Sequence, residues 1–347
     1  MRKVLHIDCD CFFAAVEMRE NPQLCHVPIA IGGHSDRRGV ISTCNYPARQ
    51  FGIHSAMATA QALKKCPPLI LLPGNMALYR DVSNQVMSII QRYGIAYEQV
   101  SVDEAYLELD PEDSAIEIGN KIRAEVEAEV GITVSVGAAP NKFLAKVASD
   151  WNKPNGLFAV KPHKVEAFVA QLEVRKIPGI GPKTAARLAE KGITLCSDAQ
   201  AYSLLELVNL FGRTGASLYK RCRGQDDRPL SAGRVRKSIS VEHTFADDIF
   251  LAEQLNDEVE LLWQKFLQRT EKADIDCRSL APFVKVKFND FSQTTLADHF
   301  QVTSLAAFRQ LLQQARLRHD ADEIQGVRLI GIGGRCPEID EQQLVLF

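Results

Sequence analysis

Two short acidic clusters in this sequence have the residue types that bind a divalent cation. The first lies in "LHIDCDCFFAAVE", where Asp8 and Asp10 end an apolar segment typical of a core strand. The second lies in "EQVSVDEAYLELD", where Asp103 and Glu104 stand in another strand-like pattern. Neighbouring residues of a regular strand point to opposite faces, so these two can serve one site only at a turn or a strand end. Carboxylates gathered there would repel one another unless a cation neutralised them.

Magnesium suits such a cluster, because it takes oxygen ligands in octahedral geometry and pairs them with substrate phosphates. Two such ions, roughly 3.5–4 Å apart, can bind the attacking and the leaving oxygen of a phosphoryl transfer. The alternative interpretation is structural. Acidic residues are common at strand ends, and Asp10 could simply cap the helix that follows it.

Two other segments carry side chains suited to phosphate. "STCNYPARQFG" offers Thr43, Tyr46 and Arg49 within one turn-rich stretch, and "SDWNKPNG" offers Lys153 on a turn containing proline and glycine. Arginine binds phosphate through two parallel hydrogen bonds, and a hydroxyl adds a neutral donor. Taken alone each segment is a weak signal, because a solvated basic side chain in a loop is the ordinary interpretation.

Residues 176–193, "KIPGIGPKTAARLAEKGI", form a more specific pattern. Gly179 and Gly181 allow the backbone to approach a ligand closely, and Pro182 suits the first turn of a helix. The free N–H groups at that helix start, with Lys183 beside them, can hold an anion. This is the pattern of a helix-hairpin-helix, which grips a DNA backbone without reading bases. The alternative is a helical hairpin that only packs on a core.

The charge distribution favours the DNA interpretation of that motif. The net charge of the chain is only −2. Residues 161–230 carry 12 Lys+Arg against 7 Asp+Glu, whereas residues 1–160 carry 15 against 18 and residues 231–347 carry 14 against 18. The helix-hairpin-helix pattern therefore lies in the one electropositive segment.

Basic side chains also recur near the C-terminus. "FVKVKF" puts Lys285 and Lys287 on one face of a strand, and "GRVRKS" adds Arg236. Such a sheet could lie along a phosphate backbone. Alternating lysines are also common on solvent-exposed edge strands, where they prevent pairing with another chain. Because the region is net acidic, DNA binding there must depend on locally clustered basic residues and should be strongly sensitive to salt.

The remaining patterns predict several compact cores. The chain has 347 residues, 46% of them hydrophobic and 24% charged, as in globular proteins with more than one domain. We expect strands near 3–8 and 132–139 and an amphipathic helix over 113–130, where apolar residues recur every four positions. Short helices broken by glycine should fill 165–225. Beyond 239, strand-like and helix-like segments alternate and predict a small α/β unit.

The number and spacing of the cysteines, together with the hydropathy, predict the cellular compartment of the protein. The nine cysteines are odd in number and scattered, and no C-x-x-C pair occurs, so a disulfide framework or zinc site is not expected. No apolar run approaches the ~18 residues of a membrane helix or forms a signal peptide. These features predict a cytoplasmic protein that contacts no membrane.

Seven segments, in this order and spacing, together resemble the Y family of DNA polymerases, and the resemblance spans essentially the whole chain. They are "DCDCFFAAVE", "NYPAR", "SVDEAYLEL", "KFLAKVASDWNKPNG", "IPGIGPKTAARL", "VEHTF" and "QLVLF". The resemblance implies an α+β multidomain fold with a palm built on a ferredoxin-like antiparallel sheet, small fingers, a helical thumb and a C-terminal α/β little finger. The implied boundaries are the palm and fingers at 1–165 (fingers about 11–75), the thumb with its helix-hairpin-helix at 166–230, a linker at 231–240, the little finger at 241–338 and a clamp-binding tail at 339–347.

The resemblance also implies roles for single residues. Asp8, Asp103 and Glu104 match the palm carboxylates that hold two Mg²⁺ ions, and Cys9 stands where the backbone carbonyl is a further ligand. Phe13 matches the steric gate, an aromatic ring that leaves no room for a 2′-hydroxyl, whereas Phe12 is expected in the core. The incoming triphosphate would be held by Thr43, Tyr46, Arg49 and Lys153.

The implied partners are primer–template DNA, a deoxynucleoside triphosphate and a sliding clamp. DNA contacts are expected at Gly179, Gly181, Lys183, Arg236, Lys285 and Lys287. The tail "QLVLF" would dock Leu344, Leu346 and Phe347 in a hydrophobic cleft of the clamp, with Gln343 bonding at its edge; the alternative is a frayed terminus. We expect a monomer.

The activity implied is template-directed DNA synthesis of the low-fidelity, translesion type, with no segment left for a proofreading exonuclease. Two other function classes deserve comparison. A nucleotidyl cyclase can share a two-metal carboxylate site but has no use for a helix-hairpin-helix or a clamp peptide. A non-catalytic DNA-binding or clamp-tethering protein would be favoured if a carboxylate were missing, and none is.

Overall fold

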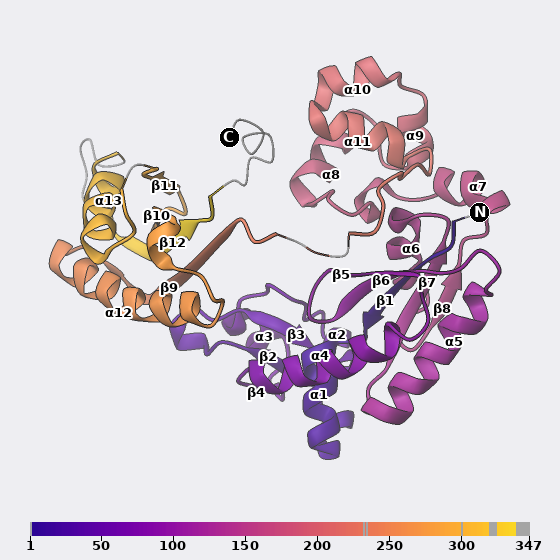
Figure 1. Cartoon of the computed structure of the whole chain (residues 1–347), viewed down its shortest axis with the longest axis horizontal. Coiled ribbons are helices and arrows are strands. Elements are labelled where there is room, and N and C mark those ends of the chain that lie inside the picture. The colour runs from indigo at the N-terminus through magenta and orange to yellow at the C-terminus, as the bar shows by residue number, and fades with distance from the viewer. Residues whose placement is uncertain (1, 232, 234, 300, 319–324, 338–347) are drawn as a thin grey trace, which may run out of the picture. The chain divides into compact units, whose positions relative to one another are not determined.

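The computed structural model describes residues 2–231, 233, 235–299, 301–318 and 325–337. The chain forms two compact units (Figure 1). The first consists of Met1–Gly32, Ile41–Met57 and Ala62–Gly233, and the second of Gly33–Val40, Ala58–Gln61 and Arg234–Phe347. The second unit therefore combines the C-terminal region with two short pieces from the N-terminal part of the chain.

The first unit is built on a five-stranded sheet whose order is β5-β6-β1-β7-β8. Its strands are β1 (Val4–Cys9), β5 (Ala96–Gln99), β6 (Glu104–Glu108), β7 (Val134–Ala139) and β8 (Leu157–Ala159). The apolar strand β1 pairs antiparallel with β6 on one side and with β7 on the other, so it is the central strand. The sheet is antiparallel as expected for the palm, except for its edge strand β8, which pairs parallel with β7.

Helices cover both faces of this sheet. One face packs against α1 (Phe12–Glu20), α4 (Met76–Ile90) and α5 (Ala115–Glu125). The apolar spacing predicted for 113–130 is confirmed, because Ile118, Ile122, Val126 and Val130 are all buried; a π-helical turn, Val126–Val130, continues α5. The other face packs against α6 (Lys142–Ser149).

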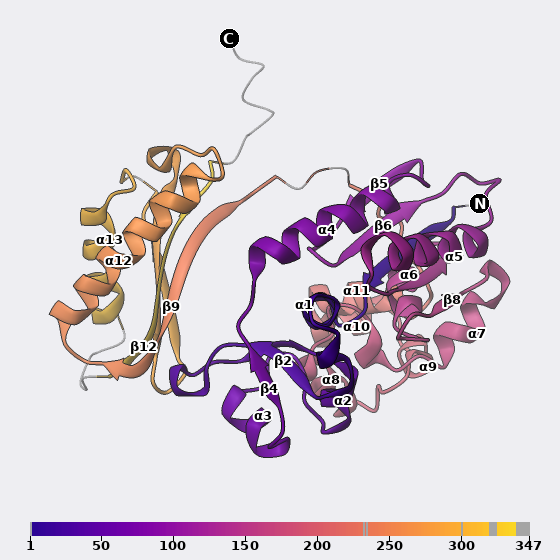
Figure 2. The ribbon, with the colours of Figure 1, turned by 90° about the horizontal axis from the view of Figure 1, so that it is seen from below.

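A small sheet of the first unit, ordered β3-β2-β4, supplies one wall of the candidate site. It consists of β2 (Ile29–Gly32), β3 (Ile41–Cys44) and β4 (Ile70–Leu72), and it lies close to α2 (Tyr46–Gln50) and α3 (Thr59–Lys65) in Figure 2. Helix α2 begins at Tyr46 because the Asn45 side chain accepts a hydrogen bond from Ala48 N and Pro47 fits the first turn.

Short helices follow along 165–225, as predicted, and gather into one cluster (Figure 1). They are α7 (Val165–Ala170), α8 (Pro182–Ala189), α9 (Cys196–Gln200), α10 (Leu204–Phe211) and α11 (Arg213–Arg221). Leu188 of α8 and Leu218 of α11 belong to the same buried cluster as Phe143 of α6, so these helices share a core with the sheet. Single 3-10 turns occur at Pro22–His26, Ser35–Arg37, Pro162–Lys164, Val174–Lys176 and Cys277–Ser279.

The chain that leaves α11 is anchored on the first unit. The Asp226 side chain is 1% exposed and pairs with Arg221 at 2.6 Å and Arg228 at 2.8 Å. Burial would raise the pKa of Asp226, but the two guanidinium groups hold it well below its usual range. Five residues on, the Ser231 N–H donates to Glu98 of β5 at 2.8 Å. Residues 226–231 are therefore fixed at both ends.

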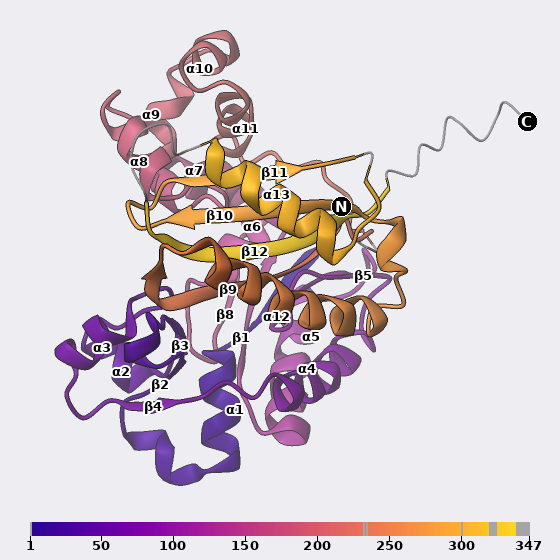
Figure 3. The same cartoon turned by 90° about the vertical axis from the view of Figure 1, so that its left-hand side faces the viewer.

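The second unit is a four-stranded antiparallel sheet, ordered β11-β10-β12-β9, with two helices on one face (Figure 3). Its elements are β9 (Ser238–Ile249), α12 (Ala252–Glu271), β10 (Ala281–Phe288), β11 (Gln293–Ala297), α13 (Leu305–Leu317) and β12 (Val327–Arg335). Strand β9 begins at Ser238, inside the segment 231–240 that was predicted as the linker. Along β10, Val284, Val286 and Phe288 are buried, which leaves Lys285 and Lys287 on the face away from the core. Among the described residues, no helix combines the length and apolarity needed to cross a membrane.

The core of the second unit yields a stability prediction. Phe266 of α12 is fully buried and meets Phe308 edge-to-face, with ring centroids 5.7 Å apart. Phe266→Ala should lower the free energy of unfolding of this unit by about 3–5 kcal/mol, because it deletes a buried ring and leaves a cavity. Leu261→Ala, at a position 57% exposed on the same helix, should change it by less than about 0.5 kcal/mol. Calorimetry measures both; a matching shift in the transition of the first unit would show that the two cores are not independent.

Candidate active site

The register of the central sheet brings two of the predicted carboxylates face to face. Asp8 of β1 is the direct cross-strand partner of Glu104, the first residue of β6. Together with His6 they form a group whose potential ligand atoms all lie within 4.8 Å of one another. Asp103 lies just before β6, at the strand end that the sequence required, and its carbonyl accepts a hydrogen bond from Cys9 N at 2.9 Å. Asp103 does not belong to the 4.8 Å group.

A pocket of about 200 Å³ opens beside these strand ends. Eight predicted site residues line it, namely Asp8, Cys9, Phe13, Thr43, Tyr46, Arg49, Asp103 and Lys153. Strand β3 supplies Thr43, and helix α2 supplies Tyr46 and Arg49, whose guanidinium lies 4.8 Å from the Tyr46 ring centroid. Ser42 and Ser55, which were not predicted, add hydroxyls to the lining. Acidic groups and the side chains predicted to bind phosphate thus line one cavity, although Glu104 is not part of its wall.

Each of the opposed carboxylates has its own ammonium group. Lys153 Nζ lies 2.7 Å from Asp8 and 2.8 Å from Asp150, while Lys146 of α6 pairs with Glu104. Burial raises the pKa of Asp8, and the Lys153 charge opposes that rise. The pKa of Glu104 falls to about 2, because the neighbouring His6 ring and the ammonium group of Lys146 outweigh its burial.

His6 supports Glu104 from within the protein. Its ring is fully buried and packs on Tyr106 at 4.7 Å; Nδ1 lies 2.8 Å from Ser149 Oγ, and Nε2 lies 3.3 Å from Glu104 Oε2. Burial lowers the pKa of His6. Sequence reasoning missed His6 and Lys146. The available signal for His6 was the period of two, which puts it on the same strand face as Asp8.

Asp10 does not cap helix α1, so the structural alternative for this residue is wrong in that form. The residue before α1 is Cys11, in a left-handed conformation (φ 41°), and the helix has no side-chain cap. Asp10 is instead a buried acceptor, 2% exposed. Its carboxylate accepts hydrogen bonds from Thr133 Oγ1 (2.8 Å), Ser135 Oγ (2.8 Å), Asn155 N (2.7 Å) and Tyr46 Oη (3.5 Å). It therefore ties α2 to the turn that carries Lys153.

The two phenylalanines have different surroundings. Phe12 is 3% exposed and belongs to the main core, as expected, and it also borders the pocket. Phe13 is half-buried and lines the pocket, where it stacks on Tyr79 of α4 with centroids 4.4 Å apart and planes at 14°. The Tyr79 hydroxyl donates to Glu17 at 2.6 Å, so the ring beneath Phe13 is held at both its face and its edge. No local pattern pointed to Tyr79.

Cys9 has no side chain available to a metal. Its thiol points into the core, and burial raises its pKa well above its usual value. A thiolate is the metal-binding form of cysteine, so only the backbone of Cys9 can contribute a ligand.

The helix-hairpin-helix segment has an exposed backbone. Gly179 adopts a positive φ of 95°, and at both Gly179 and Gly181 an added Cβ would meet no atom within 4 Å. Helix α8 starts at Pro182 without a side-chain cap, and Lys183 beside it is exposed. The open space beside Gly179 and Gly181 can accommodate a phosphate. The DNA contacts expected at Gly179, Gly181 and Lys183 remain predictions.

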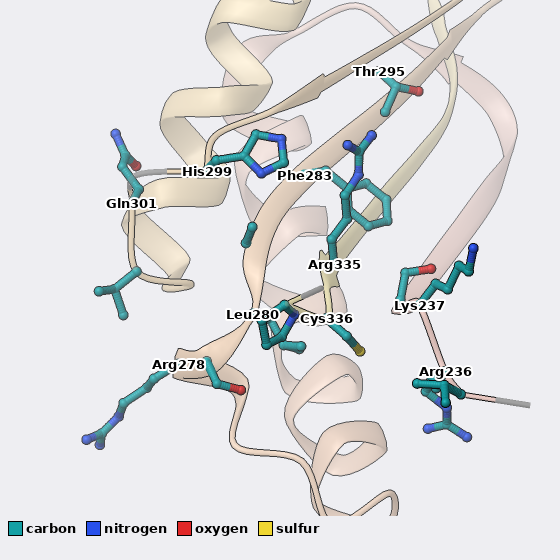
Figure 4. Close-up of a pocket in the computed structure, with 16 residues that line it drawn as sticks. Arg236, Lys237, Arg278, Leu280, Phe283, Thr295, His299, Gln301, Arg335 and Cys336 are labelled. Carbon is teal, nitrogen blue, oxygen red and sulfur yellow. The ribbon is translucent and has the colours of Figure 1, made fainter. Parts of the chain in front are cut away.

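The second unit holds a larger groove of about 1460 Å³ (Figure 4). Arg236 and Lys237 line it from the segment before β9, Arg278 from the turn before β10 and Arg335 from the end of β12. Of the described residues in its lining, none is acidic. Arg236 was predicted, whereas Arg278, His299 and Arg335 were missed because they are far apart in the sequence.

The two predicted lysines of β10 are not part of this groove's lining. Lys285 pairs with Glu242 at 2.9 Å, and Lys287 lies 4.9 Å from the Phe291 ring centroid. The predicted clamp-binding residues Gln343, Leu344, Leu346 and Phe347 lie outside the described residues.

Family models match three parts of the chain. The impB/mucB/samB family matches residues 7–150, a thumb domain described from DNA polymerase iota matches 175–226, and the impB/mucB/samB C-terminal domain matches 236–338. Two solved structures are similar over 96% of this chain and 98% of their own. A Y-family DNA polymerase chimera, Dbh-Dpo4(243-245)-Dbh, has a TM-score of 0.86 at 28% identity, and an insertion ternary complex of Dbh DNA polymerase has 0.66 at 27%.

Curated relatives are closer in sequence. DNA polymerase IV of Shewanella oneidensis is 48% identical over 336 residues, which cover 96% of this chain and 93% of that relative. DNA polymerase IV of Pectobacterium atrosepticum is 45% identical over 348 residues, covering 99% and 98%. The chain therefore belongs to the Y family of translesion DNA polymerases, within its DNA polymerase IV group.

Proposed function

We propose that the pocket beside β1 and β6 transfers a nucleotide from a deoxynucleoside triphosphate to a primer 3′-hydroxyl, with Asp8, Asp103 and Glu104 holding two Mg²⁺ ions. One observation carries this proposal: two of the carboxylates and the predicted phosphate-binding side chains line a single cavity. The solved relative described as an insertion ternary complex supports binding of DNA and nucleotide together.

The donor set suits magnesium. Asp8, Asp103 and Glu104 offer hard carboxylate oxygens, and the buried thiol of Cys9 adds no soft ligand. Three carboxylates, Asp8, Asp103 and Glu104, face two ammonium groups, so the site keeps a negative charge that a cation would neutralise. Bound there, two such ions would lower the pKa of the attacking hydroxyl and stabilise charge on the reacting phosphate.

The basic and hydroxyl side chains of the pocket would hold the triphosphate. Arg49 can form two parallel hydrogen bonds with phosphate oxygens, and Thr43 and Tyr46 add neutral donors. Lys153 is a mobile point charge that rests on Asp8 and Asp150 in this structure. An arriving triphosphate offers it a stronger anionic partner, and the Asp8 carboxylate then becomes free to bind a cation.

Phe13 is proposed as the steric gate. Its ring is fixed from behind by Tyr79, so it cannot easily tilt away from a sugar placed over it. A 2′-hydroxyl would then meet the ring, whereas a deoxyribose would not.

DNA would be held outside the pocket by two surfaces, one in each unit. The first is the backbone at Gly179 and Gly181 with Lys183. The second is the open face of the second unit, with Arg236, Lys285 and Lys287 and with the groove residues Arg278, His299 and Arg335. Clustered cations of this kind bind phosphates without sequence preference. We also propose that Gln343–Phe347 bind a sliding clamp.

Asp103→Ala tests the metal assignment. Single-turnover primer extension should fall by at least about 1,000-fold, the scale seen when a group that stabilises the transition state is lost. DNA affinity, followed by fluorescence anisotropy, should stay near wild type, because the proposed DNA surfaces lie elsewhere. Asp110→Ala, at an exposed site outside the pocket, is the matched control. Extension at the wild-type rate by Asp103→Ala would refute the assignment.

Phe13→Val tests the gate. Discrimination between dNTP and rNTP, measured as the ratio of their kcat/KM values, should fall by about 10–200-fold, the range expected for one steric contact. Phe158→Val removes a ring that stacks on Trp151 outside the pocket, and it should reduce stability while leaving the ratio unchanged. Equal discrimination by Phe13→Val and wild type would exclude the gate.

Asp10→Ala tests the buried acceptor. It leaves the Asn155 N–H and two hydroxyls without their partner, so the free energy of unfolding of the first unit should fall by about 3 kcal/mol. KM for dNTP should rise, because Tyr46 and the Lys153 turn lose their common anchor. Asp10→Asn keeps an acceptor and should recover part of both effects in denaturant titrations and steady-state kinetics. An unchanged KM in Asp10→Ala would show that the anchor is not used in nucleotide binding.

A further inference from the structure

We propose that Lys146 and His6 are positioning residues that hold Glu104 in its cation-binding orientation from outside the nucleotide pocket. The inference rests on the function proposed above, in which Glu104 is a metal ligand. Neither Lys146 nor His6 lines the pocket, and neither belongs to the set of side chains expected to touch nucleotide. Both contact the same carboxylate, and both are tied to helix α6.

Two side chains connect helix α6 with Glu104, one directly and one through His6. Lys146 and Ser149, three positions apart, lie on one face of the helix. Lys146 pairs directly with Glu104 Oε2, and Ser149 Oγ lies 2.8 Å from Nδ1 of His6. The opposite nitrogen of that ring, Nε2, lies 3.3 Å from the same Glu104 oxygen. The Nε2 contact lacks hydrogen-bond geometry, so one carboxylate oxygen is paired with an ammonium group and lies close to a buried imidazole.

The position of the proton on the His6 ring decides whether its contact with the Glu104 carboxylate is attractive or repulsive. With the proton on Nδ1, the lone pair of Nε2 would face the carboxylate, which is unfavourable in a buried site. With the proton on Nε2, the ring donates toward Glu104, and Nδ1 can accept from the Ser149 hydroxyl. The Ser149 hydroxyl has one proton and two acceptors within reach, Nδ1 of His6 at 2.8 Å and the carbonyl oxygen of Lys146 at 2.8 Å. Only when it donates to His6 does the imidazole direct an N–H at Glu104, whereas the Lys146 pairing with Glu104 does not depend on this choice.

The two lysines of the site have different access. Lys153 lines the pocket and rests on Asp8 and on Asp150, whose side chain is 65% exposed. It can exchange its carboxylate partners for phosphate. Lys146 has no place in the pocket wall, so its pairing with Glu104 persists when nucleotide arrives. Lys153 is the exchangeable counter-charge of the site, and Lys146 is the permanent one.

A simpler role for Lys146 predicts the opposite experimental sign. If its ammonium only competes with a cation for Glu104, removing it makes the site more negative and should strengthen metal binding. If it orients Glu104, removing it frees the carboxylate to turn away from the metal position and should weaken binding. Measuring metal affinity therefore distinguishes a Lys146 that competes with the cation from a Lys146 that orients Glu104, and it does so without a measurement of catalytic rate.

Mn²⁺ binding to the full-length protein provides the test. Electron paramagnetic resonance would count free Mn²⁺ during titration of the complex with dNTP and a dideoxy-terminated primer–template, which cannot react. Lys146→Met should bind Mn²⁺ about 10-fold more weakly, the lower end of the effect of losing an outer-shell partner. Lys146→Arg should remain within about threefold of wild type, and Ser149→Ala, which leaves His6 unheld, should weaken binding to a smaller extent than Lys146→Met.

Lys121→Met is the control, because it removes an exposed lysine of α5 that does not line the pocket. Its Mn²⁺ affinity should equal that of wild type even if its melting temperature falls. Wild-type or tighter binding by both Lys146→Met and Ser149→Ala would overturn the inference. If Asp8→Asn and Glu104→Gln also bind like wild type, the metal site itself has been wrongly assigned, and that outcome contradicts the proposed function instead. If Lys146→Met does not fold, Ser149→Ala alone decides.

Discussion

The first unit depends on the placement of two like charges directly opposite each other at the end of its central strand. Asp8 and Glu104 are cross-strand partners, an arrangement that destabilises a sheet unless each carboxylate has a counter-charge. Helix α6 supplies Lys146, and the turn that follows α6 supplies Lys153. The sheet, this helix and this turn are therefore coupled by electrostatics as well as by packing, and the pocket opens on the side where Lys153, and not Lys146, forms part of the wall.

In the turn from β1 into α1, the backbone adopts a conformation that local preference does not favour. Cys11 has a positive φ without being glycine, and helix α1 starts without a side-chain cap. Conformations of this kind persist when the surroundings fix them strongly. Here Asp10 provides that fixation through four partners on other segments of the chain. The direction in which Phe12 and Phe13 leave the sheet, one into the core and one to the pocket, follows from this turn.

Residue spacing predicted those parts of the molecule that depend on local pattern. The apolar period of α5, the alternation along β10 and the strand-end position of Asp103 all follow from helix and strand geometry. Residue spacing could not predict contacts between residues that are far apart in the sequence. Tyr79 under Phe13 and the pairing of His6 with Ser149 join residues far apart in the chain. The short strand β11 and the parallel pairing of β8 also lacked a local signal, because each depends on the strand already beside it.

The buried Asp226 and the bond from Ser231 to Glu98 tie the segment that leaves α11 back to the first unit's sheet and to helix α6. Asp226 also accepts a hydrogen bond from the backbone N–H of Phe143, the second residue of α6, at 3.0 Å. Glu98 accepts from both Ser231 and Lys142, so strand β5, helix α6 and this segment share one carboxylate. Loss of the Asp226 carboxylate would therefore loosen the start of α6 as well as the segment after α11, because two guanidinium groups and a buried N–H would lose the same acceptor.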